Sequence, residues 1–269
     1  MTSNKLRVAL AQINVQWQNK KATQKDVERF VSKAAHEKAD LVVFPETTLC
    51  AFPMNAVGVR IMSEPEKTGE TVKFFQSLAK KNGLAIIFGV SFFSQNKKCR
   101  NMAVMVDGSG RITAQYQNIH PFTFGKEDLH FESGEKIITF TIHGIRCSVL
   151  ICYDLRFPGV FEAIARQKSE AVFVIANWPK ARIHHWKTLL PARALDLQSY
   201  IIGVNRVGTT PENIFNGQSA AYAPDASALV IMNEKPDLAI VTLDKKIVTA
   251  ARRTFPSLKD KRFSVYSKL

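Results

Sequence analysis

Residues 146–158 read RCSVLICYDLRFP, a mostly apolar run that stops at a thiol and a charged turn. A short run of this kind, bounded by polar residues and a proline, is typical of a strand buried on both faces. Residues 41–46, LVVFPE, have the same form and end on Glu46. Strands that are apolar on both faces predict sheets covered on both sides, and therefore a layered α/β fold.

The rest of the chain continues this alternation of strands and helices. Further strands are predicted at 6–13, 84–93, 171–178 and 200–208, and helices at 22–38, 72–79 and 184–199. The turn GSG at 108–110 predicts a hairpin between 101–107 and 111–116, and 219–224 can pair with 228–232. No repeat or linker divides the 269 residues, so one domain over 1–269 is expected. The part after about Lys245 reads as a helix and a tail, which we expect to contact a partner subunit.

Composition excludes several classes of protein. Hydrophobic residues make up 46% of the chain, which is enough for a sizeable core. The chain has no run of 18 apolar residues and its first residues resemble no signal peptide, so we expect a cytoplasmic protein without a membrane contact. The four cysteines form no CxxC pair, so neither a zinc ribbon nor a thioredoxin motif is indicated.

The net charge of +14 allows two interpretations. One is binding to nucleic acid or to an anionic membrane. The other, which we favour, is a solvated lysine-rich surface, because the basic residues are scattered and no arginine–aromatic motif occurs. We therefore expect no nucleic-acid partner. A basic field also suits a small anionic substrate.

Glu46 and Cys152 each stand where a buried strand ends, which is where α/β folds place their ligand sites. Taken singly, Glu46 can be a helix cap or a solvated acid, and Cys152 a small core residue. Taken together, a thiol and a desolvated carboxylate can act as nucleophile and base. None of the six histidines is tied to Cys152 by local sequence, so a Cys–His protease stays open without support.

Three segments carry a family resemblance: LVVFPET at 41–47, YQNIHPF at 116–122 and LICYDLRFP at 150–158. In order and spacing they resemble the catalytic segments of the nitrilase superfamily of carbon–nitrogen hydrolases. The likeness spans nearly the whole chain, and 176–208 looks like the omega-amidase branch. It implies a four-layer αββα sandwich, assembly into homodimers or larger homo-oligomers, and no metal or organic cofactor.

The resemblance also implies a role for each matching residue. Cys152 would attack the amide carbon, and Glu46 would take the thiol proton and later activate water. Glu127, in GKED, matches a second acid that orients the other groups, although a solvated loop acid reads the same way. The backbone N–H of Tyr153 would be one oxyanion donor.

One position departs from the family pattern Tyr-x-Lys-x-His. The chain reads Tyr116-Gln117-Asn118-Ile119-His120, so Asn118 falls in the lysine position, with His120 as in the family. Without the ammonium we expect the pKa of Cys152 to rise and one oxyanion donor to be lost, which costs about 10²–10³ in rate. The alternative to a working enzyme is therefore a catalytically impaired homologue that binds a ligand or partner through the same pocket.

Small carboxamides are the expected substrates, in particular omega-amides of dicarboxylic 2-oxo acids such as 2-oxoglutaramate. We expect the free carboxylate of such a substrate to bind a cationic side chain on a strand-end loop. Arg156 is the first candidate and Arg182 the second. The other interpretation of Arg156 is that it pairs with Asp154 and only shapes the turn. Trp178, in the segment NWPKAR, completes the expected substrate pocket.

Overall fold

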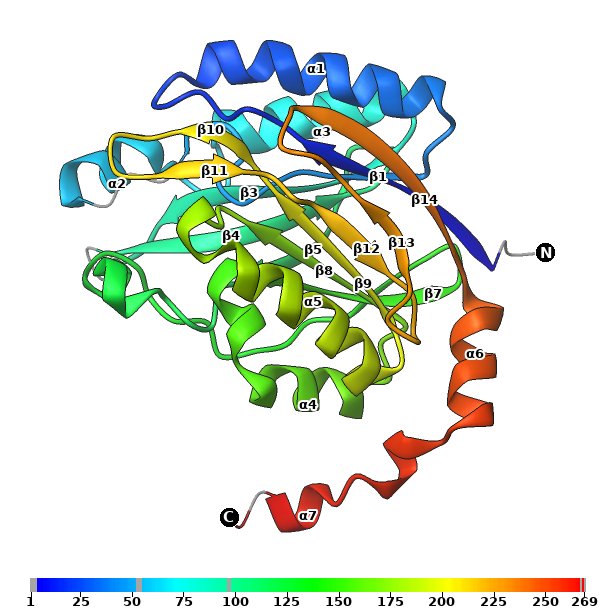
Figure 1. Ribbon diagram of the computed structural model, residues 1–269. Coiled ribbons are helices and arrows are strands. Elements are labelled where there is room, and N and C mark those ends of the chain that lie inside the picture. The colour runs from blue at the N-terminus through cyan, green and yellow to red at the C-terminus, as the bar shows by residue number, and fades with distance from the viewer. Residues whose placement is uncertain (1–3, 52–54, 96–97, 267, 269) are drawn as a thin grey trace.

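Two six-stranded sheets lie face to face at the centre of the molecule, with helices on both outer faces (Figure 1). The structure is a computed structural model that describes residues 4–51, 55–95, 98–266 and 268. The two stacked sheets with helices on both outer faces confirm the expected αββα sandwich. Both sheets contain parallel pairs in their middle, as expected for strands that are apolar on both faces.

The first sheet has the order β14-β1-β2-β3-β4-β5. Its strands are β1 (Lys5–Gln12), β2 (Leu41–Val43), β3 (Ala85–Phe93), β4 (Cys99–Val106), β5 (Ile112–Gln117) and β14 (Asp237–Asp244). Its outer face is covered by α1 (Lys20–His36) and α3 (Glu70–Asn82), while α2 (Ala56–Met62) lies beside the end of β3 (Figure 1).

The second sheet has the order β13-β12-β9-β8-β7-β6. Its strands are β6 (Phe140–Ile142), β7 (Ile145–Ile151), β8 (Ala171–Ala176), β9 (Tyr200–Asn205), β12 (Ala220–Tyr222) and β13 (Ala228–Ile231). The helices α4 (Pro158–Arg166) and α5 (Ile183–Leu197) cover its outer face, and a two-stranded ribbon of β10 (Val207–Thr209) and β11 (Ile214–Asn216) extends beyond β9 (Figure 1).

Strand β1 shows how the sequence builds the layers. Val8 and Leu10 pack in the core that also holds residues of the second sheet, whereas Ala9 and Ala11 pack in the core under α1 and α3. Successive side chains of a strand point to opposite faces, so the central part of a strand between two layers is apolar at successive positions, here Val8 to Ala11. This is why the run at 6–13 shows no polar alternation.

Most predicted elements are confirmed, with ends that shift by a few residues. The hairpin around 108–110 forms, with Met102 opposite Gln117, and β12 pairs antiparallel with β13. The elements α2, β11 and β14 have no counterpart among those predicted from the sequence. Strand β14 reads DLAIVTLD and lies antiparallel to β1 at the sheet edge, where its burial alternates too irregularly for a clear pattern.

The last part of the chain extends beyond the sheets (Figure 1), and it is tied to the rest by Arg252, which donates to the Ser169 carbonyl, and by Lys261, which pairs with Glu162 on α4. The helix α6 (Lys245–Thr254) follows β14 directly, and α7 (Phe263–Tyr266) lies near the C-terminus. Only Val248 of α6 is buried, and Phe255 just after the helix is 70% exposed. In the part of the chain that the structure describes, no helix has the length and hydropathy needed to cross a membrane.

Candidate active site

An open pocket with an empty volume of about 600 Å³ lies where strands of both sheets end. Glu46 follows β2, Cys152 follows β7 and Asn177 follows β8, so all three stand at carboxyl ends of parallel strands. Seven of the residues proposed from the sequence line this pocket: Glu46, Glu127, Cys152, Tyr153, Arg156, Trp178 and Arg182. Asn118 and His120 lie outside the lining.

Cys152 stands at a sharp change of direction. Strand β7 ends at Ile151, and the short 3₁₀ helix η3 (Cys152–Arg156) begins at once. Cys152 has φ +43°, in the left-handed region that costs a non-glycine residue about 1–2 kcal/mol. The strain turns the thiol out of the strand's pleat and into the pocket, and the surrounding hydrogen bonds hold it there.

Glu46 is 3% exposed and is held by donors from two sheets. Asn101 on β4 donates its side-chain N–H to Oε1 at 2.6 Å, and the backbone N–H of Asn177 donates to Oε2 at 2.9 Å. The Cys152 thiol donates to the same carboxylate. The thiol of Cys152 therefore lies beside the side chain expected to remove its proton.

Close packing against β3 fixes the loop that carries Glu46. A Cβ at Gly89 would lie 2.3 Å from the backbone nitrogen of Thr47 and 2.8 Å from the Cα of Glu46. The hydroxyl of Thr48 in turn receives the Gly89 N–H at 2.9 Å. Glycine at this position lets the loop approach β3 closely enough to bring Glu46 over Cys152.

The surroundings of Glu46 and Cys152 favour the protonated, neutral form of both side chains. Burial raises the pKa of Glu46 to about 7, against the opposing effect of its hydrogen bonds. Burial, and then the charges of Glu46 and Glu127, raise the pKa of the Cys152 thiol well above its usual range. Cys152 is therefore a thiol at rest, and its proton has to leave as the nucleophile attacks.

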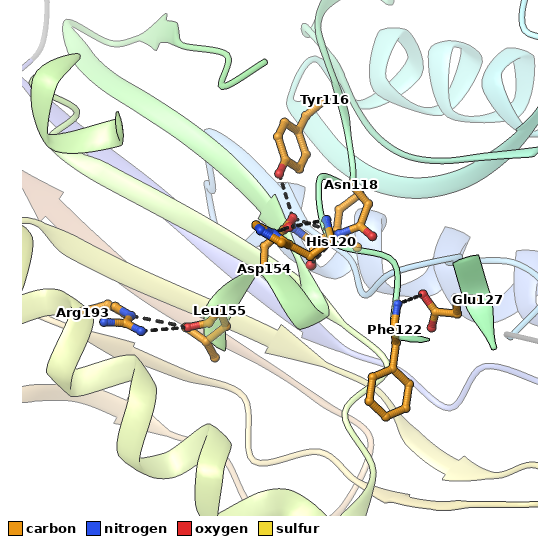
Figure 2. Close-up of polar contacts among 9 residues, drawn as sticks. Tyr116, Asn118, His120, Phe122, Glu127, Asp154, Leu155 and Arg193 are labelled. Atoms are coloured by element: carbon orange, nitrogen blue, oxygen red, sulfur yellow. Dashed lines mark hydrogen bonds and ion pairs between the residues drawn. The ribbon is translucent and has the colours of Figure 1, made fainter. Parts of the chain in front are cut away.

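Glu127 begins the short helix η2 (Glu127–Leu129), which follows η1 (Thr123–Gly125). Its Oε2 accepts the backbone N–H of Phe122 at 2.9 Å (Figure 2). Burial, and then the charge of Glu46, raise its pKa to about 8. The solvated loop acid that the sequence also allowed does not fit these contacts.

A buried carboxylate behind Cys152 holds the segment 116–120 through hydrogen bonds. Asp154 is 0% exposed and accepts five hydrogen bonds (Figure 2). The donors are the Tyr116 hydroxyl at 2.7 Å, the Asn118 amide at 2.9 Å, the His120 ring Nδ1 at 2.8 Å, and the backbone N–H groups of His120 and Ile151, each at 3.1 Å.

This cluster determines where Asn118 points. Its Nδ2 donates to Asp154 and also to the Ile151 carbonyl at 3.1 Å, so both amide hydrogens are engaged behind the nucleophile. The ring of His120 stacks on Phe157 at 3.8 Å. Asn118 and His120 therefore brace the turn that carries Cys152 and do not reach into the pocket.

The turn is also tied to α5. Arg193 is 7% exposed and donates to the carbonyls of Leu155, at 3.4 Å, and Arg156, at 3.3 Å (Figure 2). Its guanidinium lies over the ring of Phe161 and pairs with Asp196 at 3.0 Å. These contacts satisfy carbonyls that the short helix leaves free.

The outer part of the pocket is cationic and aromatic. The guanidinium of Arg156 lies 4.8 Å from the Trp178 ring and contacts the ring Nδ1 of His185 at 2.8 Å. That of Arg182 lies 5.2 Å from the Phe122 ring. Within the described residues neither arginine pairs with a carboxylate, and Asp154, the partner considered for Arg156, is occupied elsewhere.

Three residues of the site were missed in the sequence. Asn177 directly follows the buried strand at 171–176, so the strand-end argument used for Glu46 and Cys152 applied to it as well. Asp154 was considered only as a partner of Arg156. Asn101 lies inside an apolar strand and gives no local signal. Among the residues with described positions, no group of three or more His, Cys, Asp or Glu side chains is arranged to hold a metal ion.

The family model described as carbon–nitrogen hydrolase matches residues 7–253. The chain belongs to this family. A 2-oxoglutaramate amidase from Bacillus subtilis is 26% identical over 97% of the chain and 100% of its own length. An (R)-stereoselective amidase from a Pseudomonas species is 32% identical over 83% and 80% of the two chains. The carbon–nitrogen hydrolase XC1258 of Xanthomonas campestris, with an arsenic adduct in its active site, is 27% identical, covers 96% of this chain and 97% of its own, and has a TM-score of 0.87.

Proposed function

We propose that this carbon–nitrogen hydrolase removes ammonia from omega-amides of dicarboxylic 2-oxo acids, such as 2-oxoglutaramate and 2-oxosuccinamate. The observation that carries the proposal is the pair Arg156 and Arg182, which line the same pocket as Cys152 and pair with no described carboxylate. Arginine forks bind carboxylates through two parallel hydrogen bonds. The relative named 2-oxoglutaramate amidase supports the same substrate class.

The contacts of Cys152 suggest the order of the steps. As the thiol attacks the amide carbon, its proton passes to Glu46, which already accepts its hydrogen bond. The C–N bond of the tetrahedral intermediate then breaks, Glu46 returns the proton to the leaving nitrogen, and ammonia departs from a thioester. Water, deprotonated by Glu46, attacks the thioester and releases the acid. The backbone N–H of Tyr153 is the proposed oxyanion donor.

Ammonia release from a panel of small amides tests the function. We expect turnover of the 2-oxo acid amides and weaker turnover of neutral amides of equal length. A second candidate function is ligand binding without catalysis, favoured by Asn118, whose amide is engaged with Asp154. Calorimetric binding of 2-oxoglutaramate with no ammonia release would support that candidate instead.

Replacing Arg156 by Met is expected to raise the KM for acidic amides by about 10- to 100-fold, because a hydrogen bond to a charged group is lost. The KM for neutral amides should change much less. Arg111→Met, on the exposed turn after β4 where Arg111 pairs with Asp107, is the matched control. Equal losses on acidic and neutral amides would remove the binding role from Arg156.

We also propose that the C-terminal part, from α6 onward, contacts a second copy of the chain. Its exposed apolar side chains, Ile247, Phe255 and Tyr266, are 49%, 70% and 49% exposed. Phe255→Glu is expected to shift the sedimentation of the protein towards the monomer. Ile61→Glu, at a residue of α2 that is 70% exposed, is the control. A monomeric parent protein, or two variants that behave alike, would contradict this assembly.

A further inference from the structure

Two acidic side chains occupy the inner part of the pocket beside one thiol. Glu46 and Glu127 both line it together with Cys152, and the charge of Glu46 is one of the causes that raise the pKa of Glu127. Because the charge on Glu46 disfavours ionisation of Glu127, the two carboxyl groups are not both ionised at neutral pH. One of them therefore keeps a proton, and the hydrogen bonds show which.

The two carboxyl groups differ in the donors they receive. Glu46 accepts from the Asn101 side chain, the Asn177 N–H and the Cys152 thiol. Glu127 receives the Phe122 N–H on Oε2, and among the described residues no other hydrogen-bond donor reaches it. Because donors favour the ionised form, the negative charge belongs on Glu46 and the proton on Glu127.

The charged groups around Glu127 reinforce this assignment. Glu46 from the loop after β2, Asp154 from η3 and Asp128 on its own turn all raise its pKa. Among the described residues no lysine lines the pocket. The two arginines of the pocket, Arg156 over Trp178 and Arg182 over Phe122, are not among the groups that shift the pKa of Glu127.

We propose that Glu127 enters the reaction as the neutral carboxylic acid and donates a hydrogen bond to the oxyanion of the tetrahedral intermediate. The inference rests on the proposed amidase function and assigns to Glu127 the donor role that the resemblance gives to a lysine at position 118. A carboxylic acid kept neutral at pH 7 by its surroundings is an effective oxyanion donor in other enzymes.

The proton balance closes without a further group. The thiol proton of Cys152 moves to Glu46 and leaves with ammonia, while the Glu127 proton is shared with the oxyanion and stays on Glu127. In the hydrolysis of the thioester, Glu46 takes a proton from the attacking water and returns it to the departing Cys152 thiolate. The Glu127 proton again stays on Glu127. The base must be ionised and the donor neutral, so the rate should rise as Glu46 ionises near pH 7 and fall as Glu127 ionises near pH 8.

Glu127→Gln keeps the shape and a hydrogen-bond donor but cannot ionise. We expect it to lose about 10-fold in kcat at pH 7, because an amide N–H is a weaker donor than a carboxylic acid, and to lose the alkaline fall of the rate. Glu127→Ala, which removes the donor, should lose about 10²–10³ in kcat. Glu135→Gln makes the same chemical change at an exposed residue of the same region and should leave the whole pH profile unchanged.

A loss in Glu127→Gln as large as that in Glu127→Ala would overturn the inference, since it would show that the ionised carboxylate is required. Infrared difference spectroscopy gives a readout that needs no turnover. In the parent and in Glu135→Gln, the carbonyl band of a carboxylic acid should persist above about pH 7, where Glu46 ionises, and disappear above about pH 8, and Glu127→Gln should lack this component. If neither the parent nor any variant releases ammonia, the proposed function fails. An ionised Glu127 in these spectra overturns the inference by itself.

Discussion

Asn118→Lys is expected to raise kcat by about two orders of magnitude, the effect of one oxyanion donor. The Asn118 amide contacts the carbonyl of Ile151, the residue before Cys152, so a longer side chain on the same path reaches the surroundings of the thiol. An ammonium there stabilises both the thiolate and the oxyanion. The pH dependence of alkylation should accordingly show a lower pKa for Cys152.

Asn118→Gln separates the effect of charge from that of length, because it extends the side chain and keeps it neutral. We expect no gain in kcat from this variant. Asn118→Lys should also make Glu127 ionise, so Glu127→Gln should cost more kcat in the lysine background than in the parent. A parent rate that Asn118→Lys leaves unchanged would show that position 118 does not serve the oxyanion.

Cys152→Ala is expected to lower kcat by about 10⁴-fold or more, since the reaction loses its nucleophile. Mass spectrometry of the parent, mixed with substrate or an electrophile, should place the covalent adduct on Cys152. The other cysteines, Cys50, Cys99 and Cys147, are buried in the cores, whereas Cys152 lines the open pocket. Their thiols are therefore poor competitors for the reagent.

Cys147→Ala is the matched control for this experiment. Cys147 lies on β7, the strand that leads into Cys152, but it is 0% exposed. Its pKa is raised by burial and by the charge of Glu170. We expect Cys147→Ala to keep the adduct and to lose some stability through a small cavity. Labelling that goes mainly to Cys50, Cys99 or Cys147 would remove Cys152 from the mechanism.

The sequence by itself determined most of the elements and two of the groups at their ends. Runs such as 41–45 and 147–151 are apolar on both faces, which permits few structures other than a strand between two layers. Because α/β folds place ligand sites at the carboxyl ends of buried strands, Glu46 and Cys152 could each be proposed as site residues, although they follow strands of different sheets and only the packing of the two sheets makes them neighbours. The family resemblance added Glu127 and the departure at Asn118.

Only the tertiary structure decided how these groups are held. Asn101, which donates a hydrogen bond to Glu46, is separated from it by 55 positions in the sequence. The Asn177 N–H, which also donates to Glu46, is separated from it by 131 positions. Such contacts depend on strand order and on the packing of one sheet against the other, which no local pattern encodes. The same holds for Asp154, whose carboxylate gathers Tyr116, Asn118 and His120 behind the nucleophile because β5 ends beside the turn after β7.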